Sequence, residues 1–281
     1  MNDLSRDVQT ACILEASARK AGNVHPFAGF DDLNFLDFIL SAVAIGPVLM
    51  RLVDRPLGPT ILEAIRATRA VVQTNTNLGI VLLLAPLSKC ELENANPSDW
   101  PLLVRQVIDL SDVEDTKQVY EAIRLAVPGG MGKVDDQDIA KHPTESLREV
   151  MALAAERDMI ARQYGNGFRE IFYDGLPALL DGMRRFGDVE KAIQFCQIHL
   201  LSKHPDSLIA RKRGPAEAQE VMRRAQSIDL ATPGGSVRYE DFDRWLRSEG
   251  HSRNPGTTAD LITACLFTAL RTDRMQISFK Q

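Results

Sequence analysis

The chain has few of the features that mark special classes of protein. Its 281 residues contain only 4 cysteines, and 6% of the residues are aromatic. The cysteines lie far apart, at Cys12, Cys90, Cys196 and Cys265. No two of them have the short spacing of a metal site, so we expect buried free thiols in a reducing compartment. The net charge of −5 shows no excess of basic residues, which argues against a nucleic-acid partner.

The sequence also lacks a long apolar run. The longest one, residues 78–87, is shorter than the roughly 20 residues that a helix needs to cross a bilayer. Residues 1–7 are polar and acidic, unlike a signal peptide. We therefore expect a cytoplasmic protein without a membrane partner.

Alternating strand-like runs are nearly absent, and only residues 275–279 resemble a strand. Apolar residues recur instead at helical spacing. The expected helices are 3–20, 31–46, 58–73, 78–87, 99–110, 114–126, 144–163, 166–185, 188–203, 214–228, 239–248 and 257–271. The predicted fold class is all-α, with one compact multi-helix domain over residues 1–281 around a buried central helix.

The expected central helix has an unusual beginning. Asn75, Thr76 and Asn77 lead directly into the apolar run 78–87. A helix that is apolar on every side is buried, and its free N–H groups and dipole attract anions to its start. The segment therefore fits a phosphate site, although a capped core helix explains the same residues.

Several other turns combine glycine with charged residues, where a ligand can approach the backbone closely. Lys20 precedes Gly22, which is typical of a helix C-cap. Asp31 and Asp32 suit an N-cap, and they are also oxygen ligands of the kind that Mg²⁺ takes. The segment 128–133 resembles a phosphate loop but fails the Walker pattern, because no Ser or Thr follows its lysine.

Charged residues also gather in the second half of the chain. Asp158 and Arg162 have the spacing of a pair on one helix face. Asp206 is followed by Arg211 and Arg213, with a lysine between them, which suits either phosphate recognition or a solvated helix end. Thr257 and Asp260 have the spacing of a capping box.

Taken in order, these turns resemble motifs of the triphosphoribosyl-dephospho-coenzyme A synthase family over nearly the whole chain. The family's Pro-Lys-Pro-Gly loop, Asp-Met turn, Asn-Thr-His-Lys-Gly helix start, Asp-rich segment ending in Arg and Gly, and Pro-Gly-small-small-Ala-Asp-Leu turn are similar to residues 19–22, 32–33, 75–79, 206–214 and 255–261. The resemblance implies an all-helical transferase that uses ATP and Mg²⁺. In the family reaction the ribose 2′-hydroxyl of 3′-dephospho-coenzyme A attacks C1′ of the ATP ribose, and adenine leaves.

The resemblance also implies roles for residues. Lys20, Arg211 and Arg213 are candidates for the triphosphate. Asp32 and Asp260 are candidates for the catalytic base or for Mg²⁺ ligands. Asn75, Thr76 and Asn77 would orient the nucleotide at the helix start. Asp158, Arg162 and Asp206 are further candidates for the site.

Two departures from the family pattern indicate a divergent branch. Asn77 and Leu78 stand where the family has His-Lys, which removes one cation, and the loop 19–22 lacks both prolines. One alternative is a related enzyme that makes a one-carbon cofactor of the tetrahydromethanopterin or methanofuran type. Another is a nucleotide-binding protein without catalysis on the same scaffold. A homodimer is a further expectation.

Overall fold

The computed structural model describes residues 4–127 and 142–275, and within these ranges it contains fourteen α-helices and no sheet. The helices are α1 (Leu4–Ser17), α2 (Phe35–Leu49), α3 (Leu57–Arg69), α4 (Leu78–Lys89), α5 (Trp100–Asp109), α6 (Val113–Ala126), α7 (Leu147–Ala154), α8 (Met159–Asn166), α9 (Leu176–Phe186), α10 (Val189–Lys203), α11 (Ser207–Arg213), α12 (Pro215–Gln226), α13 (Gly235–Arg247) and α14 (Gly256–Arg271). Short 3₁₀ segments follow α2 and α4, and a π-helical turn, Ile171–Gly175, precedes α9. The all-α prediction is confirmed. The segment 128–133 and most of 275–279 lie outside the described residues.

Several helices differ from the sequence prediction, and α13 begins four residues earlier than expected. The expected helix 144–163 is divided into α7 and α8. The break occurs because Asp158 is the N-cap of α8, where its carboxylate accepts hydrogen bonds from the N–H groups of Ile160 and Ala161. α11 was not predicted at all. α2 begins four residues later than expected, with Asn34 and Asp37 forming a capping box.

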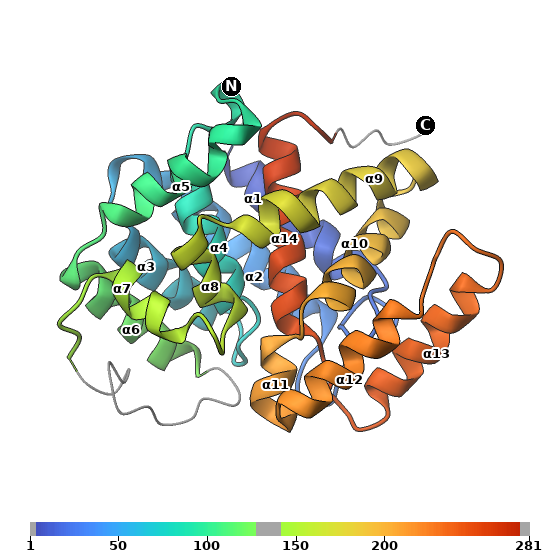
Figure 1. Ribbon diagram of the computed structural model, residues 1–281. Helices are drawn as coiled ribbons and strands as arrows, with labels where there is room; N and C mark the ends of the chain where they lie inside the picture. Colours follow the sequence, from blue (N-terminus) through green and yellow to red (C-terminus); the bar gives the residue numbers. More distant parts are fainter. Residues whose placement is uncertain (1–3, 128–141, 276–281) are drawn as a thin grey trace.

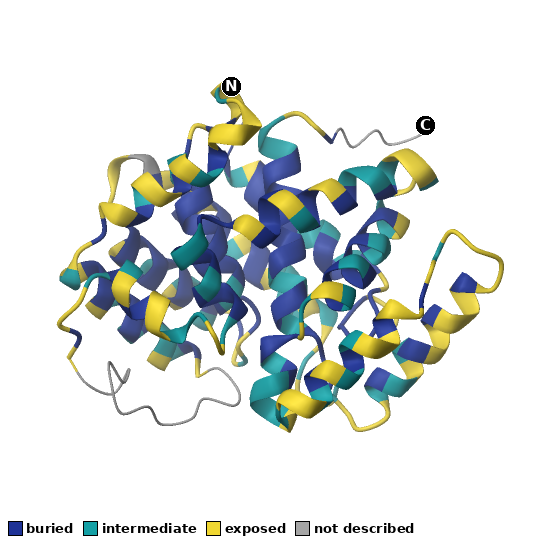
Figure 2. Cartoon of the chain, in the orientation of Figure 1, coloured by how far each residue is buried: buried dark blue, intermediate teal, exposed yellow. Residues whose placement is uncertain are grey.

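The centre of the molecule is formed by α4 and α14. In Figure 1, α14 runs through the middle, and it packs against α1, α4, α9 and α10. Every residue of α4 except Gly79 and Lys89 is buried, and Figure 2 shows the middle helices in dark blue. The prediction of a buried helix after residue 77 is therefore confirmed.

A smaller apolar cluster lies beside the main core. It is formed mainly by α10, α11, α12 and α13, with Leu201, Val221 and Leu246 among its members. In Figure 1 these helices, in orange, form one end of the molecule. α10 also contributes to the main core through Ile193 and Cys196, so the two clusters share one helix.

Each of the two most apolar helices contains a proline. Pro86 cannot donate a hydrogen bond to the carbonyl of Leu82, and the hydroxyl of buried Tyr164 donates to this carbonyl instead, at 2.6 Å. In α2, Pro47 leaves the carbonyl of Val43 without its helical donor, and Gln9 donates to it at 3.2 Å. α2 therefore continues past Pro47, where the sequence predicted its end.

Among residues 4–127 and 142–275, one helical stretch is long and apolar enough to cross a membrane by composition. This stretch, Phe35–Leu52, covers α2 and the turn after it, and 39% of it is buried inside the protein. α2 packs against α1, α3 and α4. Such a partly buried helix also suits the core of a protein without a membrane, so the stretch alone does not indicate a spanning segment.

Candidate active site

A cavity of about 970 Å³ lies where the starts of α4, α8 and α14 meet. Its wall along α6 and α7 is apolar and includes Val119, Ile123 and Met151. Polar and charged residues line other parts of the cavity, and they include Glu15, Asn23, Asp32, Arg69, Asn75, Thr76, Asn77, Arg157, Asp158, Arg211, Lys212, His251, Asn254 and Asp260. An apolar wall with convergent polar groups is typical of a small-molecule site.

Asp206 joins the starts of two helices beside this cavity. One carboxylate oxygen accepts hydrogen bonds from the N–H groups of Leu208 and Ile209 in α11, at 2.9 and 3.1 Å. The other accepts from the N–H and hydroxyl of Thr258 in α14, both at 2.8 Å. Asp206 is buried and does not line the cavity. Asp206 therefore links α11 to α14. The predicted capping box between Thr257 and Asp260 does not form, because the carboxylate of Asp206 caps α14 instead.

Asp260 lies near the beginning of α14, just after its first turn, and points to the start of α4. A Cβ atom built on Gly79 would lie 2.1 Å from Oδ2 of Asp260, so the carboxylate rests directly on the glycine. Burial raises the pKa of Asp260 well above its ordinary value, and the nearby carboxylates of Glu15 and Asp206 raise it further. No group in the described ranges donates a hydrogen bond to this carboxylate. It is therefore available to a ligand.

Substitution of Gly79 by Ala is expected to impair catalysis in a protein that still folds. The added methyl group would displace the Asp260 carboxylate, and such overpacking costs about 1–3 kcal/mol. Alanine offsets part of this cost, because it favours a helix by up to about 1 kcal/mol over glycine. We expect a turnover number at least about tenfold lower, since misplaced catalytic groups cost up to ~10²-fold, with a modestly lower melting temperature. Steady-state kinetics and thermal denaturation test this, and a variant of full activity would contradict the placement of Asp260.

Arg211 brings a cation to the same cavity. Its guanidinium pairs with Asp158, which also caps α8. The Nε atom of Arg211 and the hydroxyl oxygen of Thr74 are buried, and neither has a hydrogen-bond partner in the described structure. Because buried polar groups are normally hydrogen-bonded, two unpartnered ones on one cavity indicate a polar ligand. The predicted Asp158–Arg162 pair was wrong: Asp158 precedes the helix, and Arg162 bonds the carbonyl of Ala155 instead.

A second charged group lies at the end of α11. Nδ1 of His251 is 3.0 Å from Oδ1 of Asp32, and Nζ of Lys212 donates to the carbonyl of His251 at 3.3 Å. Burial lowers the pKa of the Lys212 ammonium, and Asp32 and Asp206 partly offset this effect. Asp32 therefore lines the cavity as predicted, but it pairs with His251 and does not cap α2.

The start of α4 presents the amide-rich segment to the cavity. Oδ1 of Asn75 accepts a hydrogen bond from the N–H of Leu78 at 3.1 Å. The side chain of Asn77 makes no cap and donates to the hydroxyl of Thr68 at 2.9 Å. Thr76 bonds Ser41 of α2. All three predicted residues line the cavity, and Asn75 is the most exposed of them.

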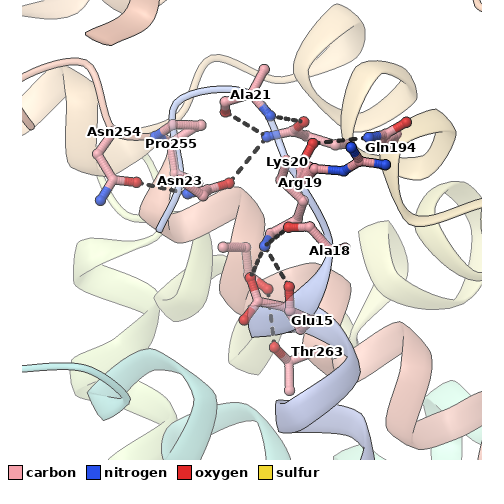
Figure 3. A network of polar contacts seen from close by, with 12 residues as sticks. Glu15, Ala18, Arg19, Lys20, Ala21, Asn23, Gln194, Asn254, Pro255 and Thr263 are labelled. Atoms are coloured by element: carbon pink, nitrogen blue, oxygen red, sulfur yellow. Dashed lines mark hydrogen bonds and ion pairs between the residues drawn. The ribbon is translucent and has the colours of Figure 1, made fainter. Parts of the chain in front are cut away.

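Three of the predicted cations, Lys20, Arg162 and Arg213, do not line the cavity. Nζ of Lys20 lies 2.8 Å from Oε1 of Glu15, and both side chains are almost fully buried. The ammonium also donates to the carbonyls of Glu15 and Ala18 at the end of α1, so the C-cap interpretation describes its position. Figure 3 shows Lys20 turned back onto Glu15. Arg213 pairs with Glu249 on the outside of α11.

The loop after α1 and the loop before α14 are joined beside the cavity. Nδ2 of Asn23 donates to Oδ1 of Asn254 at 2.7 Å (Figure 3). Nε2 of Gln197 donates to Oδ1 of Asn23 at 3.0 Å. Both asparagines line the cavity. They were not predicted as site residues, and neither were Glu15, Lys212 and His251. Asn23 and Asn254 adjoin the predicted turns 19–22 and 255–261, and Lys212 lies between the two predicted arginines.

The residues present fit a magnesium ion only if a substrate completes its coordination. Within the described ranges, no group of three or more His, Cys, Asp or Glu side chains could hold a metal alone. Mg²⁺ commonly binds one or two carboxylates together with substrate phosphates. Asp260 accepts no hydrogen bond within the described ranges and offers one such carboxylate, and Asp32 lines the same cavity.

Comparison with known proteins identifies the family. The model of the ATP:dephospho-CoA triphosphoribosyl transferase family (CitG) matches residues 1–279. The chain belongs to this family. It is therefore an enzyme of the transferase class, linked to cofactor biosynthesis. A search of curated proteins found no match.

A solved structure supports the family assignment. The chain is 27% identical to a protein from Archaeoglobus fulgidus that carries the provisional name triphosphoribosyl-dephospho-coA synthase. The similarity covers 84% of this chain and 98% of that one, with a TM-score of 0.66. The family therefore retains its fold in a chain whose helix start, at Asn77 and Leu78, departs from the motif.

Proposed function

We propose that the cavity between α4 and α14 binds ATP and dephospho-CoA and transfers the triphosphoribosyl group between them. The bond that forms joins the ribose 2′-hydroxyl oxygen of dephospho-CoA to C1′ of ATP, and the bond that breaks is the one to adenine. The single observation that carries this proposal is the convergence of Asp260, Arg211 and the α4 start on one cavity. The family assignment makes the one-carbon and non-catalytic alternatives unnecessary.

The charged, amide and apolar groups of the cavity suggest which part of the substrates each can bind. Arg211, with an unpartnered Nε, and Lys212 are the cations that can bind the triphosphate. The amide groups of Asn75 and Asn77 can orient the nucleotide at the helix start. The apolar wall of α6 and α7 suits an adenine ring or the pantetheine arm.

Asp260 is the candidate base. A carboxylate with a raised pKa accepts a proton more readily than an ordinary one and suits general base catalysis near neutral pH. It would take the proton of the attacking 2′-hydroxyl, and the departing adenine would take a proton from solvent. Bound Mg²⁺ would neutralise charge on the triphosphate, held by Asp260 or Asp32 with the phosphates.

The reaction is tested by measuring free adenine from ATP and Mg²⁺, with and without dephospho-CoA. We expect release that depends on both substrates and on the metal. Protection against heat by ATP without any adenine release would leave a nucleotide site and refute the transfer. The four cysteines are buried and free, which suits the cytoplasm as the place of the reaction.

Arg211 and Arg213 form a matched pair for testing the triphosphate site. Both lie on α11, but only Arg211 lines the cavity. We expect Arg211→Met to reduce kcat/KM for ATP by about 10²-fold, because charged hydrogen bonds contribute about 1.5–3 kcal/mol. Arg213→Met is expected to stay within about twofold of the original enzyme. Equal losses in both variants would show that the cations of α11 act on stability alone.

A further inference from the structure

The outer face of α2 carries an apolar stripe that nothing in the described structure covers. The stripe consists of Leu36, Leu40, Val43, Pro47 and Met50, all of which are exposed. The exposed fractions of Leu36 and Val43 are 59% and 53%. The opposite face of α2 is buried through Ala42, Ile45 and Leu49. Contiguous exposed apolar side chains of this kind mark an interaction surface.

The spacing of the stripe fits another helix. Its members are four, three, four and three residues apart along the chain. This is the 3.5-residue repeat of helices that pack in pairs along a narrow seam. A helix lying on a lipid surface instead has a polar face rich in Lys and Arg. The first turn of α2 instead carries Asp37, and Asp31 and Asp32 precede the helix.

The charges at the ends of the stripe favour a second copy of the same helix in the opposite direction. Asp37 directly follows Leu36 and Arg51 directly follows Met50, so both lie on the same edge of the stripe. Arg51 shares Glu63 with Arg55, and this group of three carries one net positive charge. Antiparallel helices bring Asp37 to Arg51 at both ends. In parallel helices the equal edges lie on opposite sides of the contact, so Asp37 and Arg51 would not meet.

We propose that two copies of this chain associate through the stripe on α2, with the two α2 helices antiparallel. The contact is isologous, since the same patch meets itself about a twofold axis near Val43. One helix pair gives an interface at the small end of the specific range, below about 1,200 Å². The dimer is therefore reversible, and its population grows with protein concentration.

Analytical ultracentrifugation of the full chain over a wide concentration range tests the association. We expect a monomer–dimer equilibrium in the original protein and a monomer in the Val43→Glu variant. Val237→Glu on α13 is the matched control, because Val237 is equally exposed, at 57%, and lies outside the stripe. It should dimerise like the original protein. Circular dichroism checks that both variants are folded.

Cross-linking tests the direction of the helices. The four native cysteines are buried, so introduced surface thiols can be oxidised selectively with diamide. A mixture of Leu36→Cys and Met50→Cys proteins should form a disulfide-linked dimer, whereas each variant alone should not. Cross-linking of each variant with itself would show parallel helices and overturn the antiparallel arrangement.

Two further outcomes would overturn the association itself. One is a monomer at every concentration, and the other is a dimer that Val43→Glu leaves intact. If the original protein were monomeric and sedimented with vesicles of anionic phospholipid, the stripe would bind a membrane surface and not a second copy of the chain. Val43→Glu should then abolish sedimentation with the vesicles.

Discussion

Replacement of Asp260 by Asn is expected to reduce adenine release by about 10²–10⁴-fold, the range that general base catalysis contributes. The amide keeps the size of the side chain on Gly79 but cannot accept the proton of the 2′-hydroxyl. Asp31→Asn is the matched control, because Asp31 is exposed and does not line the cavity. It should leave the rate within about twofold. Activity retained by Asp260→Asn would remove Asp260 from the mechanism.

The pH dependence gives a second measure of Asp260. A base must be ionised, so kcat/KM should rise with pH through the pKa of Asp260. This pKa is raised by burial and by Glu15 and Asp206, and the rise should therefore lie above the ordinary range of a carboxylate, about 3.9. The native protein holds this proton more tightly than the unfolded chain. Asp260 consequently destabilises the fold as pH rises through that window.

The Asp260→Asn variant does not ionise at this position, so it lacks the loss of stability that ionised Asp260 causes as pH rises. We expect its free energy of unfolding at neutral pH, measured with urea and without ligands, to equal or exceed that of the original protein. A gain in stability together with loss of activity is typical of a residue kept for function. A purely structural Asp260 would give the opposite result, an unstable variant.

Replacement of Lys20 by Met is expected to lower the free energy of unfolding by about 3–5 kcal/mol. The Lys20–Glu15 pair is almost fully buried, and removal of one partner leaves the other charge uncompensated in the interior. The ammonium also satisfies carbonyls at the end of α1. Urea denaturation followed by circular dichroism measures the loss.

A double variant separates charge from packing in this pair. Lys20→Met combined with Glu15→Met removes both charges, and buried ion pairs replaced by apolar residues are often neutral for stability. We expect the double variant to recover most of the loss. A single variant as stable as the original protein would show that the pair contributes nothing. Activity is not the readout here, because Glu15 itself lines the cavity.

The sequence predicted the helices well where apolar periodicity was strong. α11 was missed because its seven residues end in three consecutive cations, Arg211 to Arg213, which give no periodic signal. The break before α8 was missed because Asp158 and Arg162 have the spacing of a helical pair. Only the tertiary structure shows that Asp158 caps the helix start and turns to Arg211.

The site was less predictable than the fold, because its residues are distant in the chain. The contact between Gly79 and Asp260 joins positions 181 residues apart, and no local pattern reports it. The sequence singled out Lys20 but could not show that Glu15 lies beside it in the interior. The family motifs marked turns that border the cavity, and burial decides which side chain of each turn faces it.

The two prolines of the apolar helices have a consequence for helix sliding. An apolar helix among apolar neighbours can shift along its axis with little change in packing, and one turn is a movement of about 5.4 Å. Such a shift would separate the Tyr164 hydroxyl from the single carbonyl that Pro86 leaves open in α4, and it would leave a buried acceptor unsatisfied at a cost of about 1–3 kcal/mol. In α2 the bond from Gln9 to the carbonyl of Val43 is exposed, so water can replace it and it holds the helix less firmly. The buried bond at Pro86 thus gives α4 one preferred position along its axis, and it fixes the register of a helix that carries the cavity.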